Sequence, residues 1–432
     1  MPVLLGIGIV ATLGREIVFA NYLGVSRELE IFRIAFALPN MLSQSLATAY
    51  IGAMMPALIL AQSAGQGVYE AFCRRLARIT VAGVVALAIT GALTVSIQAG
   101  VMAPGFDSAS LSTLKIALLA CWLFFLLAGM SFLPRLHLNR REEFWPGASA
   151  SILISAVLIV AGAMVVPNSE QSGATILAYA SIVAGGFILL VHTWREPHWL
   201  STLFGRYDDP APSSPGSDQI PAIAAPVVIV VLLHAANALP RFIDRAVGSL
   251  MDGGVVAALE YSFNIITVPG ILLGSALIMV LYPEFVERIK TQRGTSLGNL
   301  PRISMGAVAV AAVGGVGIFF FADDIVRLVY ARGEFDAAAT AMTSTLLKWH
   351  SLGLGFMVLT MILLQACLAF SIYKILIAVA LARIAAKALA VWWLVPTYGM
   401  DGLGISFIVP EALSAVLLVG VLYTLIRRGQ PL

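Results

Sequence analysis

Charged side chains inside apolar segments are the residues of this chain that are best placed to do chemistry. Gly14-Arg15-Glu16 interrupts the first long apolar run, and Arg241, Asp244 and Arg245 interrupt another in the second half. An arginine at the centre of a bilayer costs about 2.5–3.5 kcal/mol, so it is kept mainly where it faces a cavity, a partner or a ligand. A guanidinium binds phosphate oxygens bidentately and stays charged at any relevant pH. These residues therefore predict a cationic site for a phosphate-bearing ligand.

The spacing of these charges leaves two interpretations open. Arg241 and Arg245 stand four residues apart and share a helical face, with Asp244 beside them. Together with Arg15, three arginines face only two local acids, Glu16 and Asp244, which favours ligand binding. The alternative is internal ion pairing, Arg15 with Glu16 and Arg241 with Asp244.

Further charged residues extend the candidate site. Glu30 and Glu260 each precede a proline that frees a helix carbonyl and forms a natural hinge, and both acids could pair with the arginines. For Glu30 the alternative of a solvated acid at a helix start is favoured, because charged residues surround it. Arg383 and Lys387, four residues apart, suit either a cavity or snorkelling to the interface. Polar residues expected to make hydrogen bonds between helices are His234, Asn237, Lys348 and His350.

Composition places these residues in a membrane protein. The chain has 432 residues, of which 59% are hydrophobic and 11% charged, against about 25% charged in a soluble domain. Apolar runs of about 20 residues recur along the chain, and each is long enough to cross a bilayer as a helix. We therefore expect an all-α polytopic membrane protein rather than a soluble helical one. The twelve predicted spans are 3–22, 34–62, 80–103, 112–134, 147–166, 174–193, 222–250, 256–284, 303–322, 340–369, 373–395 and 403–425.

Charges between the spans predict the orientation of the chain. Of the 26 Lys and Arg residues, 15 follow even-numbered spans or the last span, and five follow odd-numbered spans. Basic residues concentrate in cytoplasmic loops, so both termini are expected in the cytoplasm. The first apolar run begins at Pro2 without a basic region or a cleavage site, so we expect it to be a retained first span.

The chain divides into two related halves. A Pro/Ser/Gly-rich stretch predicts a cytoplasmic linker over 196–221, between an N-lobe of six spans (1–195) and a C-lobe of six spans (222–432). In this linker, residues 199–204 suit either a short interfacial helix or a solvated loop. At an offset of 230 residues, Arg15 matches Arg245 and Glu30 matches Glu260, and Asp107 before span 4 resembles Asp336 before span 10. Two parallel repeats predict lobes facing each other around a central cavity.

No pattern in the sequence predicts a metal site or direct use of ATP. The three cysteines form no CxxC pair, and Asp323-Asp324 alone is more typical of a helix cap than of a metal site. No glycine-rich segment resembles a P-loop, and the glycines of 314–317 suit close helix packing. We expect no bound cofactor, but a coupling ion, Na+ or H+, is compatible with a transporter of this kind.

Two segments resemble a known family. Gly14-Arg15-Glu16-Ile-Val-Phe-Ala-Asn-Tyr-Leu-Gly24, with Phe32-Arg-Ile-Ala-Phe-Ala-Leu-Pro-Asn40, is similar to the opening of the MviN/MurJ family of lipid II flippases. The segment 326–335, with Arg332-Gly-Glu-Phe335, resembles the stretch before span 10 of that family. The family belongs to the multidrug/oligosaccharidyl-lipid/polysaccharide exporter superfamily. The resemblance implies two six-helix lobes around a cationic cavity in the bacterial inner membrane, and Arg15 and Glu30 match charged positions of the family.

The resemblance implies a flippase for a polyprenyl-pyrophosphate-linked saccharide that works by alternating access. Twelve predicted spans are fewer than the fourteen typical of the family, so an exopolysaccharide or capsule precursor is as consistent a substrate as lipid II. The alternative is a cation-coupled multidrug exporter of the same superfamily, in which acids should outnumber arginines in the cavity. A membrane enzyme would need clustered aspartates for a metal-bound diphosphate. We expect membrane lipids and the lipid-linked saccharide as partners, no nucleic acid, and a monomer.

Overall fold

A computed structural model shows a helical chain. The structure describes residues 2–169, 171–204, 233, 236–290, 300–369 and 372–428, and in these residues every regular element is a helix. Most of the predicted linker, residues 205–221, and the predicted hydrogen-bonding residue His234 lie outside the described residues. The chain forms two compact units, Met1–Ala235 and Ala236–Leu432, and each is described by itself.

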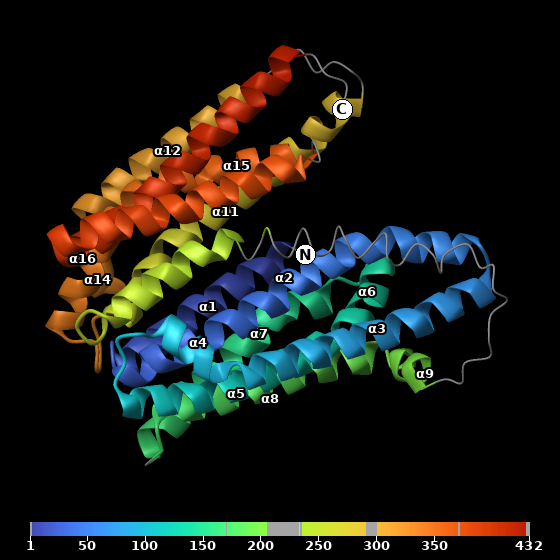
Figure 1. Ribbon diagram of the computed structural model, residues 1–432, viewed down its shortest axis with the longest axis horizontal. Coiled ribbons are helices and arrows are strands. Elements are labelled where there is room, and N and C mark those ends of the chain that lie inside the picture. Colours follow the sequence, from blue (N-terminus) through green and yellow to red (C-terminus); the bar gives the residue numbers. More distant parts are fainter. Residues whose placement is uncertain are drawn as a thin grey trace. The chain divides into compact units, whose positions relative to one another are not determined.

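The N-terminal unit is a bundle of long helices. In order they are α1 (Pro2–Leu23), α2 (Arg27–Ser63), α3 (Gln66–Leu93), α4 (Val95–Met102), α5 (Ser108–Met130), α6 (Phe132–Arg140), α7 (Trp145–Val160), η1 (Ala161–Val165), η2 (Val166–Asn168), α8 (Gly173–Arg195) and α9 (His198–Phe204). Figure 1 shows α5 and α8 running side by side, and α5 also packs on α2, while α1 packs on α7. These contacts hold the first two helices, which carry the predicted charges, against the rest of the unit.

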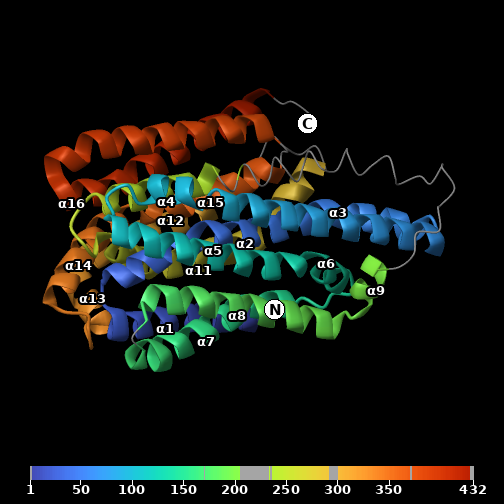
Figure 2. The ribbon, with the colours of Figure 1, turned by 60° about the horizontal axis from the view of Figure 1, so that its bottom comes forward.

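The core of the N-terminal unit reaches the residues that follow α8. Tyr50, Leu76 and Trp122 belong to one buried cluster, and Trp199 of α9 is buried in the same cluster. Figure 2 shows α9 lying against the first part of α3. Residues 199–204 are therefore a packed helix, and the alternative of a solvated loop is wrong, because the indole of Trp199 finds apolar neighbours there.

The C-terminal unit begins with a helix over residues 236–249, which the sequence predicted as part of span 7. It continues with α11 (Val255–Lys290), α12 (Leu300–Phe320), α13 (Ala322–Tyr330), α14 (Ala337–Leu352), α15 (Leu354–Ala369) and α16 (Tyr373–Arg428). α16 is two helices joined at Gly399, whose φ of 54° and ψ of −124° are not helical. Glycine tolerates this conformation because it lacks a Cβ. The break confirms the predicted division of this segment into two spans.

Aspartates at equivalent positions of the two halves start helices. Asp107 caps α5 by accepting a hydrogen bond from the Ala109 amide (3.3 Å). Asp336 caps α14 by accepting one from the Ala339 amide (2.7 Å). A short side-chain acceptor satisfies an amide that has no partner in the first helical turn. The two aspartates that the sequence repeat matched therefore have the same structural role, a helix cap, in both units.

The helices have the lengths and composition of membrane spans. Among the described residues, seven helices are long and apolar enough to cross a membrane, and nine are if two bent pairs each form one span. The bent pairs are α12 with α13, at 80°, and α14 with α15, at 50°. Every predicted span coincides with helical residues, the seventh only over 236–249 in the described part. The predicted fold class, an all-α polytopic membrane protein, is confirmed.

Candidate functional site

Five charged residues of α1 and α2 form what we call the N-terminal charge cluster. Arg15 donates to Glu16 through Nη2 (2.6 Å) and Nε (3.1 Å). Arg33 of α2 donates to the other oxygen of Glu16 (2.7 Å). Arg27 pairs with Glu30 at 2.8 Å. Glu16, Glu30 and Arg33 are buried, and the pair of Arg33 with Glu16 joins α2 to α1 where water is scarce.

The structure corrects two interpretations of this region. Glu30 is fully buried, so the favoured alternative of a solvated acid at a helix start is wrong. Arg33, counted from the sequence as a loop charge, lies inside α2 and shares Glu16 with Arg15. The one sequence signal that Arg33 belongs to this cluster was its position, three residues after Glu30 and at the start of an apolar run. The predicted Arg15–Glu16 pair is present, but Glu16 balances two guanidinium groups.

The acid between these pairs, Glu28, has a structural role. One oxygen of its carboxylate accepts from the backbone amide of Ala174 (2.9 Å) and from the hydroxyl of Ser172. These groups lie at the start of α8, where amides lack helical partners and a negative charge is favoured. Glu28 therefore fastens the start of α2 to α8, and its charge is committed there rather than to the cluster.

A second set of charges joins the helix over 236–249 to both halves of α16. The ammonium of Lys387 lies 2.5 Å from Asp244 and donates to the hydroxyl of Ser406 (2.6 Å). Lys387 is 1% exposed and Asp244 is 2% exposed. Removing two charges from water costs several kcal/mol for each, so the pair persists only because each ion satisfies the other.

Two further ion pairs lie in the same unit. Arg245 donates to Glu260 of α11 (2.8 Å). Arg383 pairs with Glu411 across the break in α16. With the Lys387–Asp244 pair they place one cation on each of three carboxylates. We call these residues, together with Arg241, the C-terminal charge cluster.

Arg241 is the cation that remains. Its guanidinium lies 4.9 Å from the centre of the Phe263 ring, a cation–π contact, and its side chain is exposed. No carboxylate makes an ion pair with Arg241 among the residues the structure describes. The C-terminal cluster therefore holds four cations and three carboxylates, and the N-terminal cluster holds three and two.

The partners in the C-terminal unit differ from those predicted. The alternative pair of Arg241 with Asp244 is wrong, because Asp244 pairs with Lys387 from a distant segment. Glu411 was missed entirely, although an acid after Pro410 inside an apolar run was a signal of the same kind as Glu16. Arg383 is paired and partly buried rather than snorkelling to the interface.

The other polar residues have structural roles. The hydroxyl of Ser262 lies 2.8 Å from Nδ1 of His350, so the predicted hydrogen bond between helices is present. Asn237 accepts from Arg383 (3.5 Å), which also joins two helices. Lys348 of α14 makes an ion pair with Asp323 of α13 (3.6 Å) near the surface, so its predicted polar contact between helices takes the form of an ion pair.

One more buried acid lies at the end of α8, outside the predicted spans. Glu196 pairs with Arg141 (2.7 Å) and lies 3.9 Å from Nδ1 of His137. Burial alone raises the pKa of Glu196, but the nearby imidazole of His137 and the charge of Arg141 outweigh burial and lower that pKa. Glu196 therefore carries its charge at neutral pH and joins α6 to α8.

Metal binding finds no support in the described part of the chain. There, no group of three or more His, Cys, Asp or Glu side chains could hold a metal ion. Cys73, Cys121 and Cys367 are buried and unpaired with one another. Both clusters consist of guanidinium, ammonium and carboxylate groups, of which the guanidinium and ammonium groups can bind anions.

Comparisons of the sequence with known proteins agree on one family. The family model described as lipid II flippase MurJ matches residues 19–432. A probable lipid II flippase MurJ from Rhizobium tropici is 26% identical over 427 residues, covering 96% of this chain and 78% of that protein. The lipid II flippase MurJ of Burkholderia cenocepacia is 24% identical over 420 residues, covering 95% of this chain and 80% of that protein.

Solved structures share the fold. A lipid II flippase MurJ in an inward closed conformation has a TM-score of 0.79 at 17% identity, over 98% of this chain and 87% of that chain. An inward-facing multidrug resistance MATE family transporter of the MOP superfamily has a TM-score of 0.76 at 14% identity, over 98% of this chain and 95% of that chain. At such identities the likeness concerns the fold alone.

Proposed function

Because the chain belongs to the lipid II flippase MurJ family, we propose that it moves a polyprenyl-diphosphate-linked saccharide across the bacterial inner membrane. The relatives are named as flippases, so the chain is a transporter rather than an enzyme. Lipid II is the first candidate substrate because it stands in the names of these relatives. An exopolysaccharide or capsule precursor carries the same diphosphate and lipid, so the experiment below compares the two.

The observation that carries this proposal is the surplus guanidinium in each charge cluster. Arg241 makes a cation–π contact with Phe263, and it feels the charges of Glu260 and Glu411, whose ion pairs are made with Arg245 and Arg383. In the N-terminal cluster, Arg15 and Arg33 share the single carboxylate of Glu16. A diphosphate is an anion with many acceptor oxygens, and a guanidinium binds it through two parallel hydrogen bonds. A net positive site also disfavours the cationic compounds that a multidrug exporter would carry.

Alternating access is the mechanism that we infer for the transport. Each cluster holds ion pairs that join two helices of its own unit, so each unit can move as a body while these charges stay paired. The driving force is the membrane potential or a coupling ion, Na+ or H+, and the chain acts as a monomer. The prediction that Arg15, Arg241 and Arg245 converge on one cavity stays a prediction.

The test is transbilayer movement of a fluorescent lipid II in vesicles that contain the purified chain. We expect the double variant Arg15→Ala/Arg241→Ala to flip at least about a hundredfold more slowly, because each charged hydrogen bond to the diphosphate contributes about 1.5–3 kcal/mol. A fluorescent capsule precursor is assayed in parallel, and the faster substrate identifies the saccharide.

The matched control is Arg195→Ala. Arg195 pairs with Glu143 at 2.5 Å on the surface and lies outside both clusters, so its loss should leave the rate unchanged. Equal rates for the double variant and the unaltered chain would refute the role of the surplus guanidinium groups. Efflux of cationic drugs by the unaltered chain, without movement of either lipid, would instead support the multidrug alternative.

A further inference from the structure

α13 is a short helix that turns across the end of α12. The two helices meet at an angle of 80°, and together they are apolar enough to form one broken span. Figure 2 shows α13 beside α14 at one end of the C-terminal unit, and the two helices pack on each other. If α12 crosses the membrane, a helix at 80° to it lies nearly in the plane of the membrane surface.

The side chains of α13 suit a membrane surface. Its buried face is formed by Ala322, Val326 and Tyr330, at four-residue spacing. Leu328 is 77% exposed on another side of the helix, and Phe321 at its start is 61% exposed. Charged residues occupy the rest of its circumference. Exposed apolar and charged faces on one helix are typical of helices that lie in the bilayer interface.

Aromatic residues mark the same end of the C-terminal unit as an interface. The ring of Trp349 lies 5.8 Å from that of Phe319 at the end of α12, and its indole donates to Asp401 (2.6 Å), just after the break in α16. Trp392 and Trp393, shortly before that break, are 76% and 70% exposed. Exposed tryptophans gather at the level of lipid headgroups, where one end of the ring is apolar and the other polar.

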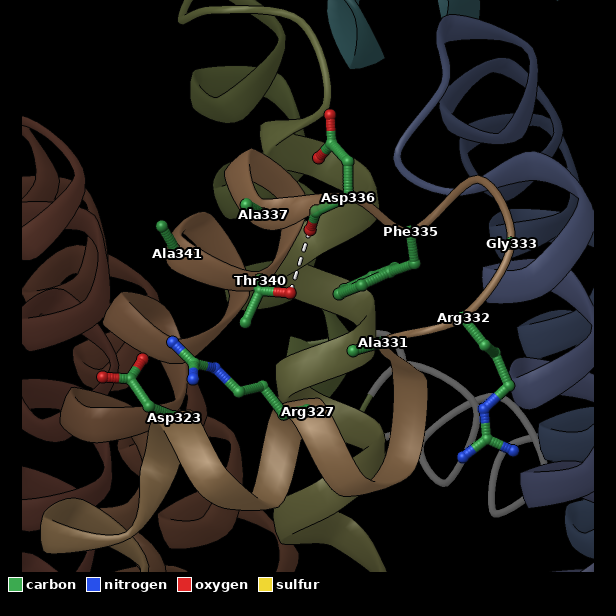
Figure 3. Close-up of a pocket in the computed structure, with 10 residues that line it drawn as sticks. All are labelled: Asp323, Arg327, Ala331, Arg332, Gly333, Phe335, Asp336, Ala337, Thr340 and Ala341. Carbon is green, nitrogen blue, oxygen red and sulfur yellow. Dashed lines mark hydrogen bonds between the residues drawn. The ribbon is translucent and has the colours of Figure 1, made fainter.

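A cavity of about 550 Å³ opens between the charged face of α13 and the start of α14 (Figure 3). Figure 3 shows Arg327 beside Asp323 on one side and Asp336 on the other, with Thr340 between them. Asp323 is paired with Lys348, so the guanidinium of Arg327 leaves its side of the wall positive, while Asp336 makes the other side negative and a hydroxyl lies between them. Such a distribution fits a ligand that itself carries both charges.

Some of the charged groups of this wall already have partners. Asp323 pairs with Lys348 (3.6 Å), and Arg332 donates to a backbone carbonyl of α13 (2.7 Å). One oxygen of Asp336 caps α14. The guanidinium of Arg327 and the second oxygen of Asp336 are the groups with capacity for a ligand, one cationic and one anionic.

We propose that this cavity binds the headgroup of a membrane phospholipid that carries a phosphodiester and a primary ammonium. Arg327 binds the phosphate oxygens, Asp336 accepts from the ammonium, and Phe321 and Leu328 lie against the acyl chains. An anionic headgroup brings no cation for Asp336. A choline headgroup has a cation but no N–H to donate, so the site distinguishes it from a primary ammonium.

The experiment is native mass spectrometry of the purified full chain in detergent with equal amounts of phosphatidylethanolamine, phosphatidylcholine and phosphatidylglycerol. We expect phosphatidylethanolamine to be retained about tenfold more than either other lipid. Arg327→Gln should weaken its retention about tenfold, because a charge-assisted bond to phosphate is lost. Asp336→Asn should abolish the preference over phosphatidylcholine while the cap remains, since asparagine caps helices as well as aspartate does.

The matched control is Asp324→Asn, one residue from Asp323 on the same helix but outside the cavity wall. This variant should bind phosphatidylethanolamine as the unaltered chain does. All variants should have the same midpoint temperature of thermal unfolding, which shows that each of them is folded. The proposal is overturned if phosphatidylglycerol is retained as well as phosphatidylethanolamine, or if Arg327→Gln and Asp324→Asn bind alike. Competition by water-soluble glycerophosphoethanolamine is expected, and its failure would mean that acyl chains rather than the headgroup are bound.

Discussion

Buried carboxylates in both units pair with cations of another helix. Glu16 has Arg33, and Asp244 has Lys387, 143 positions later. Burial makes each of these groups costly when alone, while the pair is tolerated. The two charges of such a pair are therefore coupled. Substitution of one residue leaves the charge of its partner buried and uncompensated.

Lys387→Met is expected to lower the free energy of unfolding by about 3–5 kcal/mol, because it leaves Asp244 buried without its cation. The measurement is denaturant unfolding of the purified chain in detergent. In the control Lys387→Met/Asp244→Leu no charge is left, so most of the lost stability should return. If the single variant unfolds at the same denaturant concentration as the unaltered chain, the pair does not stabilise the fold.

The pH dependence of stability should report the Glu196 carboxylate. Its pKa in the folded chain lies below the ordinary value of 4.5, because the nearby imidazole of His137 and the charge of Arg141 outweigh the effect of burial. Its stabilisation is therefore full above about pH 4.5 and is lost as the pH falls through the folded pKa. Glu196→Gln should unfold more easily at pH 7.

Thermal unfolding of both chains between pH 3 and pH 7 checks this expectation. The difference between them should shrink below about pH 4.5, where the carboxyl group becomes protonated in the unaltered chain too. A difference that stays constant over the whole range would show that the charge of Glu196 is not what stabilises the end of α8.

At the level of elements, single glycines decide how closely two helices approach. A Cβ at Gly315 of α12 would lie 2.2 Å from the carbonyl oxygen of Ser351 in α14, whereas a Cβ at Gly314 or Gly317 would meet nothing within 4 Å. The predicted close packing of this glycine-rich segment therefore rests on one of its three glycines. A backbone oxygen cannot move aside as a flexible side chain can.

Gly315→Ala should lower the stability by about 1–3 kcal/mol, because the added methyl group pushes α12 from α14. Gly314→Ala is the matched control, since it adds the same group to open space and improves helix propensity by up to about 1 kcal/mol. Denaturant unfolding of both variants in detergent measures the difference. Equal effects of the two substitutions would show that the helices are not in the close contact described.

At the level of the whole molecule, the distribution of basic residues predicts the orientation in the membrane. Fifteen of the 26 Lys and Arg residues follow even-numbered spans or the last span. The structure places three of them, Arg74, Arg75 and Arg78, within α3 rather than in a loop. They nonetheless lie in its first half, before the apolar part, so the orientation predicted from them is unchanged.

Fusion reporters test this orientation. A green fluorescent protein fused after Leu432 should fluoresce, because it folds in the cytoplasm. An alkaline phosphatase inserted at Gly333, in the segment after span 9, should be active, because it is exported there. The reverse result at both positions would show the opposite orientation. Every site would then lie on the other side of the membrane.

The spans and their order could be predicted from the sequence, because the apolar length needed to cross a bilayer is a local property. The break at Gly399 falls in the gap predicted between spans 11 and 12. The likeness of Asp107 to Asp336 was visible as well, although the helix caps that they make were not predicted. The importance of Arg15, Arg241 and Arg383 was also visible locally, since a charge in an apolar run needs a partner wherever that partner is.

The sequence suggested the pair of Arg15 with Glu16, but the long-range partner of Asp244 was decided by the tertiary structure alone. The sequence suggested Arg241 for Asp244 because the two are neighbours on one helix, but packing of α16 brings Lys387 to Asp244 and leaves Arg241 on Phe263. The cavity beside α13 depends in the same way on an 80° bend that no local pattern predicts. Ion pairs form between groups that packing brings within reach, and proximity in space is a property of the folded helices rather than of residue order.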